Sequence, residues 1–125
     1  MSYNQPLELR VIQLGGIDGT SAATTSIITT NAGERFMPLF VSIQLQSTTG
    51  FAVAASLSIG TDVGVSNILP ITALTGVSAA NLMINLPLVA VIPSVAPSTA
   101  ISVKVTTPAT ATTYVLRVAL IGYYS

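Results

Sequence analysis

The last thirteen residues, Thr113-Tyr-Val-Leu-Arg-Val-Ala-Leu-Ile-Gly-Tyr-Tyr-Ser125, decide the fold that the sequence predicts. They are typical of one long β-strand, in which successive side chains point to opposite faces. One face is wholly apolar and consists of Tyr114, Leu116, Val118 and Leu120. The other face carries a single charge and consists of Val115, Arg117, Ala119 and Ile121. Because both faces are largely apolar, we expect a central strand of a sheet or a strand that another molecule covers.

Shorter stretches of similar composition run through the rest of the chain. Val, Ile, Thr and Ser are frequent, no stretch has the 3.6-residue period of an amphipathic helix, and clusters of Gly, Pro, Asn and Asp separate the apolar runs. The expected strands are residues 7–14, 23–30, 35–46, 51–59, 67–74, 81–92, 100–106 and 113–125. Pro70 suits a short edge strand, and Pro87 interrupts the strand that contains it.

These strands predict an all-β fold. The expected architecture is a jelly-roll-like antiparallel β-sandwich of about eight strands, a single domain over residues 6–125 behind a short flexible segment at residues 1–5. An immunoglobulin-like sandwich is the alternative, although the cysteines and the tryptophan typical of that fold are absent.

The alternation also assigns faces within the predicted strands. In the third strand it directs Phe36 and Phe40 outward, with Pro38 on the same outward face. The expected inward face of that strand is Met37, Leu39, Val41, Ile43 and Leu45. In the first strand Leu7, Leu9 and Val11 form one apolar face, and the Gly-rich residues 15–20 that follow predict a turn.

Composition excludes several classes of function. Half of the 125 residues are hydrophobic and 6% are charged, against about 25% charged in ordinary soluble domains. The four basic and four acidic residues cancel, so neither a nucleic-acid-binding face nor a basic patch for a membrane surface is expected. A chain so apolar and so poor in charge is expected to bury much of its surface against other subunits or a partner.

The mean hydropathy of +0.76 raises the question of a membrane span. A spanning helix needs about 20 consecutive apolar residues, and the most apolar uncharged window, residues 86–103, contains Pro87, Pro93 and Pro97. Prolines at that spacing break a helix, so we expect no transmembrane helix. The first six residues have no basic region and no apolar run, so we also expect no signal peptide.

The sequence contains no His and no Cys, which excludes most catalytic triads, disulfides and thiolate metal sites. Lys104 is expected to be solvated on a strand face. Of the carboxylates Glu8, Asp18, Glu34 and Asp62, the second and fourth lie in Gly-rich segments, where Asp favours turns. Residues 15–19 lack the further oxygen ligands of a calcium loop and the Lys of a phosphate loop. We therefore expect no catalytic residue, no cofactor and no metal site.

Aromatic residues are the remaining candidates for recognition. An aromatic platform for sugars would have to come from Tyr3, Phe36, Phe40, Tyr123 and Tyr124, for which a place in the core or at the rim of the sandwich is the ordinary alternative. As candidates for an interface with another subunit or a partner the sequence indicates Phe36, Phe40, Arg117, Tyr123 and Tyr124.

Four short stretches carry a resemblance to a known group of proteins. They are Arg35-Phe-Met-Pro-Leu-Phe40, Leu57-Ser-Ile-Gly-Thr61, Val105-Thr-Thr-Pro-Ala109 and Tyr114-Val-Leu-Arg-Val-Ala-Leu-Ile-Gly-Tyr-Tyr124. Together they make residues 20–125 resemble the single-domain jelly-roll cement, or capsid decoration, proteins of tailed bacteriophages.

The resemblance implies a non-enzymatic virion protein that sits as a homotrimer on the outer surface of the capsid and bridges subunits of the major capsid protein. It implies no role for any particular residue. The alternative is a glycan- or receptor-binding head of a phage tail or head fibre, and a small glycan hydrolase is a third hypothesis.

Overall fold

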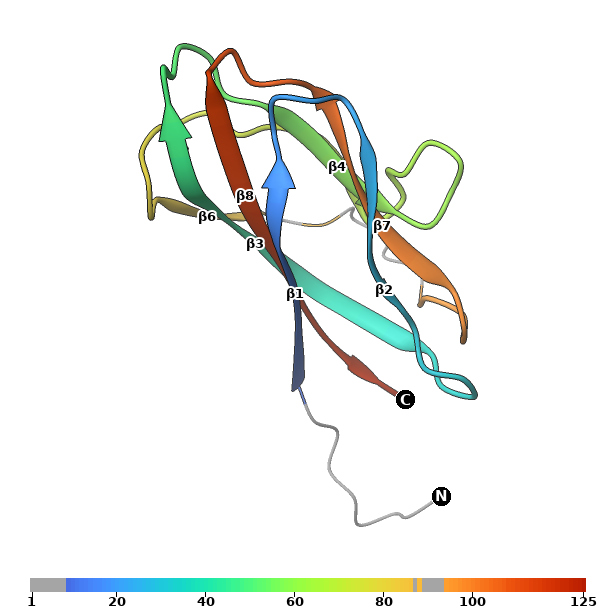
Figure 1. The fold of residues 1–125 in the computed structure, drawn as a ribbon. Helices are drawn as coiled ribbons and strands as arrows, with labels where there is room; N and C mark the ends of the chain where they lie inside the picture. Colours follow the sequence, from blue (N-terminus) through green and yellow to red (C-terminus); the bar gives the residue numbers. More distant parts are fainter. Residues whose placement is uncertain (1–8, 87, 89–93) are drawn as a thin grey trace.

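The computed structural model describes residues 9–86, 88 and 94–125, and in that part of the chain it contains strands and loops but no helix (Figure 1). The strands are β1 (Leu9–Asp18), β2 (Thr24–Thr29), β3 (Phe36–Thr49), β4 (Ser56–Gly60), β5 (Leu69–Ala73), β6 (Met83–Leu86), β7 (Ala100–Thr107) and β8 (Thr113–Tyr124). The predicted N-terminal segment, residues 1–5, lies outside the described residues, as do Pro87 and residues 89–93.

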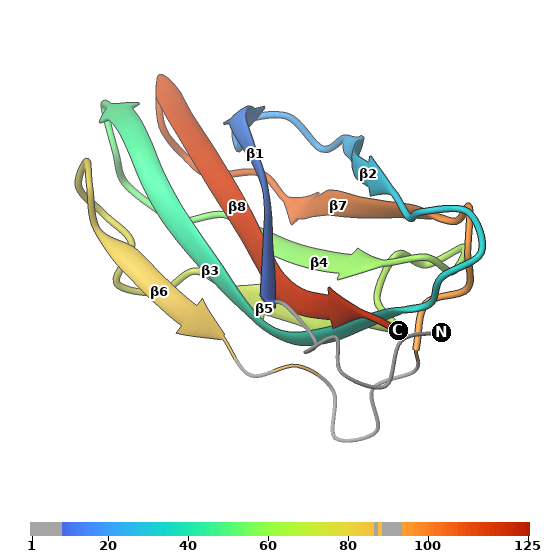
Figure 2. The same cartoon turned by 90° about the horizontal axis from the view of Figure 1, so that it is seen from below.

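The strands form two four-stranded sheets, with the orders β1-β8-β3-β6 and β2-β7-β4-β5. Every pairing is antiparallel. Figure 2 shows the two sheets as separate layers. The pairs β1–β8, β2–β7, β3–β6 and β4–β5 are nested, as they are when one long hairpin is wound into the two layers of a jelly roll. The predicted all-β sandwich is confirmed, and the immunoglobulin-like alternative is wrong.

β8 has the central place that its two apolar faces predict, because it is hydrogen-bonded to β1 on one side and to β3 on the other. The predicted inner face is confirmed, since Tyr114, Leu116, Val118 and Leu120 are all fully buried. Burying an apolar side chain of this size stabilises the fold by about 1.5–3 kcal/mol relative to leaving it exposed. The C-terminal stretch is therefore the centre of the core.

The other strands complete the core from both sheets. β3 contributes Val41, Ile43 and Leu45, β4 contributes Leu57 and Ile59, and β7 contributes Ile101, Val103 and Val105. The Tyr114 hydroxyl donates a hydrogen bond of 2.6 Å to the carbonyl oxygen of Val77, which satisfies a polar group that would otherwise be buried without a partner. Burial raises the pKa of Tyr114.

A β-bulge corrects the predicted faces of β3. The register with β8 shifts between Pro38 and Phe40, so the alternation changes phase at Leu39. As a result Phe36 and Pro38 are buried, although the sequence directs both outward, and Leu39 is 44% exposed, although the sequence directs it inward. Met37 lies opposite the outward-facing Tyr123 and is also displaced from the predicted core.

The first strand also differs from its prediction. β1 continues through the predicted turn to Asp18, with a bulge between Leu14 and Ile17 that Gly16 accommodates at a φ of 71°. Glycine adopts a positive φ without the steric penalty that other residues meet. Leu9 and Val11 are 64% and 62% exposed, so this apolar face of the strand points outward.

The remaining strands follow the sequence with shifted ends. β5 contains Pro70 and is an edge strand, as predicted. β4 begins at Ser56 rather than at residue 51, and Val53 forms an isolated bridge with Thr110. β6 ends at Leu86, the residue before Pro87 in the sequence. It is an edge strand of its sheet and pairs with β3.

Candidate interaction surface

The outer face of the sheet β1-β8-β3-β6 carries an apolar band that crosses three strands. Val11 of β1 and Phe40 of β3 both lie opposite Ile121 of β8 in the strand register, so the three side chains form one row. Val11 is 62% and Phe40 is 42% exposed. Ile121, between them, is 9% exposed although it does not belong to the core cluster, which fits a position shielded by its two outer neighbours.

A second row extends the band toward the end of the sheet. Leu9 of β1 and Met37 of β3 both lie opposite Tyr123 of β8. Leu9 is 64% exposed, and the other two side chains are half-buried. Together the two rows form the apolar band, which consists of Leu9, Val11, Met37, Phe40, Ile121 and Tyr123. Exposed apolar surface that is contiguous over several strands marks an interaction site more often than scattered residues do.

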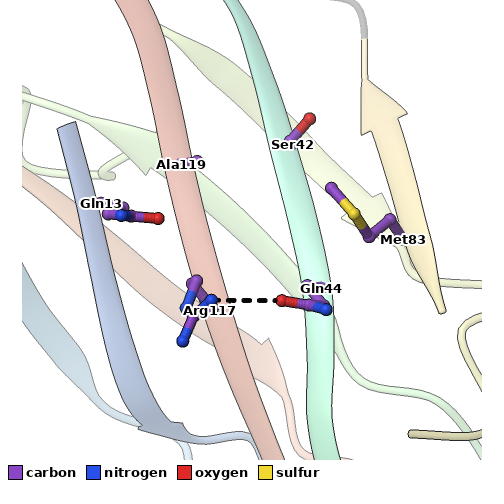
Figure 3. Close-up of a pocket in the computed structure, with 6 residues that line it drawn as sticks. All are labelled: Gln13, Ser42, Gln44, Met83, Arg117 and Ala119. Atoms are coloured by element: carbon purple, nitrogen blue, oxygen red, sulfur yellow. Dashed lines mark hydrogen bonds between the residues drawn. The ribbon is translucent and has the colours of Figure 1, made fainter. Parts of the chain in front are cut away.

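Beside the apolar band the same face becomes polar and hollow. A shallow depression of about 240 Å³ lies over β1, β8, β3 and β6 (Figure 3). Its lining is Gln13, Ser42, Gln44, Met83, Arg117 and Ala119. Register explains the grouping, because Ala119 lies opposite both Gln13 and Ser42, and Gln44 lies opposite both Arg117 and Met83. The depression is therefore two adjacent rows of outward side chains.

Arg117 is the cation of this depression. Its Nη1 atom donates to Oε1 of Gln44 over 3.5 Å, at the long limit for a hydrogen bond, as the dashed line in Figure 3 shows. The carboxylate of Asp18 is on the same face, opposite Val115, but it accepts hydrogen bonds from the backbone N–H and the hydroxyl of Thr20. These bonds lower the pKa of Asp18. Among the described residues Arg117 has no carboxylate partner.

The structure separates the five predicted interface residues into two groups. Phe40, Arg117 and Tyr123 lie together on the outer face. Phe36 is fully buried, and Tyr124 packs on it with ring centroids 5.1 Å apart. The Tyr124 hydroxyl is buried and has no hydrogen-bond partner among the described residues. The predicted outward position of Phe36 is wrong, because the bulge in β3 turns its side chain into the core.

The sequence does not indicate several contributors to this face. Leu9 and Val11 form an apolar face of the first predicted strand but are not among the interface candidates, Met37 is expected to point inward, and Gln13 and Met83 are not singled out. The available signal was the apolar character of both faces of the first strand, which alternation alone does not resolve into an inner and an outer set.

The acidic residues that the structure describes lie apart from one another. Within residues 9–86, 88 and 94–125 there is no group of three or more Asp or Glu side chains that could hold a metal ion. Asp62 accepts a hydrogen bond of 2.8 Å from the Ser66 backbone N–H within its own loop, as expected for an Asp in a turn. No helix in this part of the chain is long and apolar enough to cross a membrane.

Comparison with known proteins gives a match in structure and none in sequence. No family model and no curated protein matches the chain. A solved structure described as the Cyanophage Pam1 capsid asymmetric unit contains a chain with a similar fold, with a TM-score of 0.61 and 16% sequence identity. The match covers 98% of this chain and 89% of that chain. The chain thus shares its fold, over nearly its whole length, with a chain of a phage capsid asymmetric unit.

Proposed function

We propose that this chain is a non-enzymatic structural protein of a phage virion. More specifically, it is a cement or decoration protein that sits on the outer surface of the capsid as a homotrimer and bridges subunits of the major capsid protein. The observation that carries the proposal is the fold that it shares, over 98% of its length, with a chain of a cyanophage capsid asymmetric unit. The short stretches that resemble phage cement proteins support it independently.

The outer face of the sheet β1-β8-β3-β6 supports a role in assembly. Leu9 and Val11 expose more than half of their surface there, next to the partly exposed Phe40. Depletion of charge and enrichment in apolar and aromatic side chains are typical of the buried centre of a protein interface. A cement protein needs such a surface on a stiff scaffold, and the central position of β8 in its sheet supplies the scaffold.

The polar groups also support a structural role. Asp18 and Asp62 are engaged by hydrogen bonds within their own segments. Arg35 donates from Nε to the Ser94 hydroxyl and from Nη2 to the Ser94 carbonyl oxygen. These hydrogen bonds hold segments of the chain in place, as is expected of charged side chains with a structural role.

The proposal is tested by purifying particles of the phage whose genome carries this gene. Mass spectrometry is expected to detect the chain in washed particles, and antibodies against it are expected to label the outside of intact heads in immunogold electron microscopy. Light scattering on the isolated protein is expected to give the mass of a trimer. Particles that lack the chain would overturn the proposed function, and a monodisperse monomer would overturn its homotrimeric part.

The glycan-binding alternative requires exposed aromatic rings beside carboxylates. Phe40 and Tyr123 are partly exposed on the outer face, but the Asp18 carboxylate on that face is engaged by hydrogen bonds from Thr20. No specific observation therefore favours this alternative, and it stays a prediction for which hits on a glycan array are the test.

A further inference from the structure

The loop between β4 and β5 presents a second exposed surface, away from the outer face described above. Val63 is completely exposed at 102%, and Asp62 precedes it in the chain. Figures 1 and 2 both show the light-green loop that follows β4 at the end of the molecule away from β6. The loop and the outer face of the sheet β1-β8-β3-β6 therefore belong to different sides of the chain.

This loop is held in one conformation by its own hydrogen bonds. Asn67 accepts from the Thr61 backbone N–H over 2.8 Å and donates to the Thr61 hydroxyl over 3.0 Å. Ser66 donates from its backbone N–H to Oδ1 of Asp62. Val65 is 8% exposed and has a φ of 52°, which is unusual for a β-branched residue. Val65 thus anchors the loop while Val63 projects from it, and a loop that is already ordered loses little entropy on binding.

The loop and the depression carry opposite charges. The depression offers Arg117, which has no carboxylate partner among the described residues, and the loop offers Asp62, whose Oδ2 is not used by the hydrogen bond from Ser66. The depression of about 240 Å³ is large enough to admit an aliphatic side chain such as Val63. Val63 follows Asp62 directly in the chain, and Arg117 lines the depression.

We propose that the chain self-associates head to tail, with the β4–β5 loop of one copy seated in the depression of the next, Val63 over Ala119 and Met83, and Asp62 paired with Arg117. Contacts between two different surfaces of the same chain close into a ring when the rotation between copies allows it, as a trimer requires. A two-fold dimer with its axis through Arg117 would instead bring the arginines of the two copies together, and like charges in a contact are unfavourable. This inference rests on the self-association that is part of the proposed function.

A charge-swap experiment on the full chain tests the contact. Arg117→Glu and Asp62→Arg each place two like charges in the contact, and each is expected to weaken association tenfold or more, as seen by light scattering or sedimentation over a concentration series. The double variant with both changes is expected to recover the wild-type oligomer. Glu34→Lys is the matched control, because that carboxylate lies in the β2–β3 loop, and it is expected to leave the oligomer unchanged.

A second variant separates loss of the contact from loss of loop structure. Val63→Asp changes a side chain that is fully exposed, so it is expected to dissociate the oligomer while the unfolding curve of the monomer stays the same. An oligomer that survives both Val63→Asp and Arg117→Glu would overturn this contact and leave the proposed virion function standing. Failure of the double swap to restore association, in a chain whose unfolding curve matches that of Val63→Asp, would also overturn it. A monomeric wild type would overturn the contact and the homotrimer together, while detection of the chain in particles tests the virion role separately.

Discussion

Replacing Phe36 and Leu39 in turn by alanine distinguishes the structure of β3 from the simple alternation of its sequence. Alternation predicts that Leu39 is core and Phe36 is surface, whereas the bulge makes Phe36 0% and Leu39 44% exposed. The Phe36 ring packs on the Tyr124 ring and also fills the space beside Gly122, where an added Cβ would lie 2.7 Å from Cζ of the ring. Its removal would leave a cavity that the backbone of two paired strands cannot close.

The expected magnitudes are well separated. Truncation of a buried Phe to Ala lowers the free energy of unfolding by about 3–5 kcal/mol, and loss of the aromatic pair with Tyr124 is part of that figure. Leu39→Ala is expected to lower it by less than about 1 kcal/mol, as is usual for a side chain that lies outside the core. Because self-association adds to apparent stability, urea unfolding of all variants is compared at one protein concentration.

Leu116→Ala is the reference variant, because Leu116 is fully buried on the inner face of β8. This substitution is expected to lower the free energy of unfolding by about 2–5 kcal/mol. If Leu39→Ala destabilises as much as Leu116→Ala and Phe36→Ala has little effect, the bulge between Pro38 and Phe40 is wrong, and with it the buried position of Phe36.

Three further predictions concern single contacts. Tyr114→Phe leaves the buried carbonyl oxygen of Val77 without its donor and is expected to lower the free energy of unfolding by about 1–3 kcal/mol, measured by urea denaturation. Gly122→Ala makes a Cβ clash with the backbone oxygen of Met37 in β3, so it is expected to lower the free energy of unfolding by at least about 1–3 kcal/mol, because it forces the two strands apart. The hydrogen bonds from Thr20 lower the pKa of Asp18 in the folded chain. They therefore stabilise the fold fully at a pH above the pKa of Asp18 in the unfolded chain, and this stabilisation is lost as the pH falls through the pKa of Asp18 in the folded chain. An NMR titration of the Asp18 carboxyl carbon measures the pKa in the folded chain.

Each of these predictions has a control and an outcome that contradicts it. Gly64→Ala is the control for Gly122→Ala, because a Cβ there meets no atom closer than 3.4 Å; equal effects at the two sites would contradict the close approach of β3 and β8. Phe51, half-buried beside Tyr114, should remain stacked in Tyr114→Phe, and an unchanged stability would show that the hydroxyl contributes nothing. Thr20→Val should return the Asp18 pKa toward its ordinary value, and a pKa that does not move would exclude Thr20 as the cause.

The sequence predicts strands reliably where the two-residue period is unbroken. β7 and β8 have no bulge within their inward runs, and Ile101, Val103 and Val105, like the four inner residues of β8, are buried as predicted. β3 breaks the period at Leu39, and one extra residue reverses the two faces of the strand on one side of it. The local hint was Pro38, since proline within a sheet is tolerated at bulges, but a proline alone does not say where the phase changes.

The candidate surface was harder to predict than the fold. The outward positions of Phe40 and Arg117 could be predicted, because the alternation within each strand directs both side chains to the outer face. The depression could not be predicted, because it depends on which residues of β1, β3, β6 and β8 lie opposite one another. The pattern within one strand carries no information on its register with another strand. The exposure of Val63 could not be predicted from the residues around it in the sequence either. Its role in the proposed contact rests on this exposure and on the hydrogen bonds that fix its loop.

Cryo-electron microscopy of the intact particle tests directly whether this chain is a capsid cement protein. We expect density that fits this β-sandwich on the outer surface of the head, in groups of three, with each copy in contact with the major capsid protein. The β4–β5 loop of each copy is expected to lie against the depression around Arg117 of its neighbour. A head surface without such density, or this fold found on a tail or fibre, would show that the chain is not a cement protein.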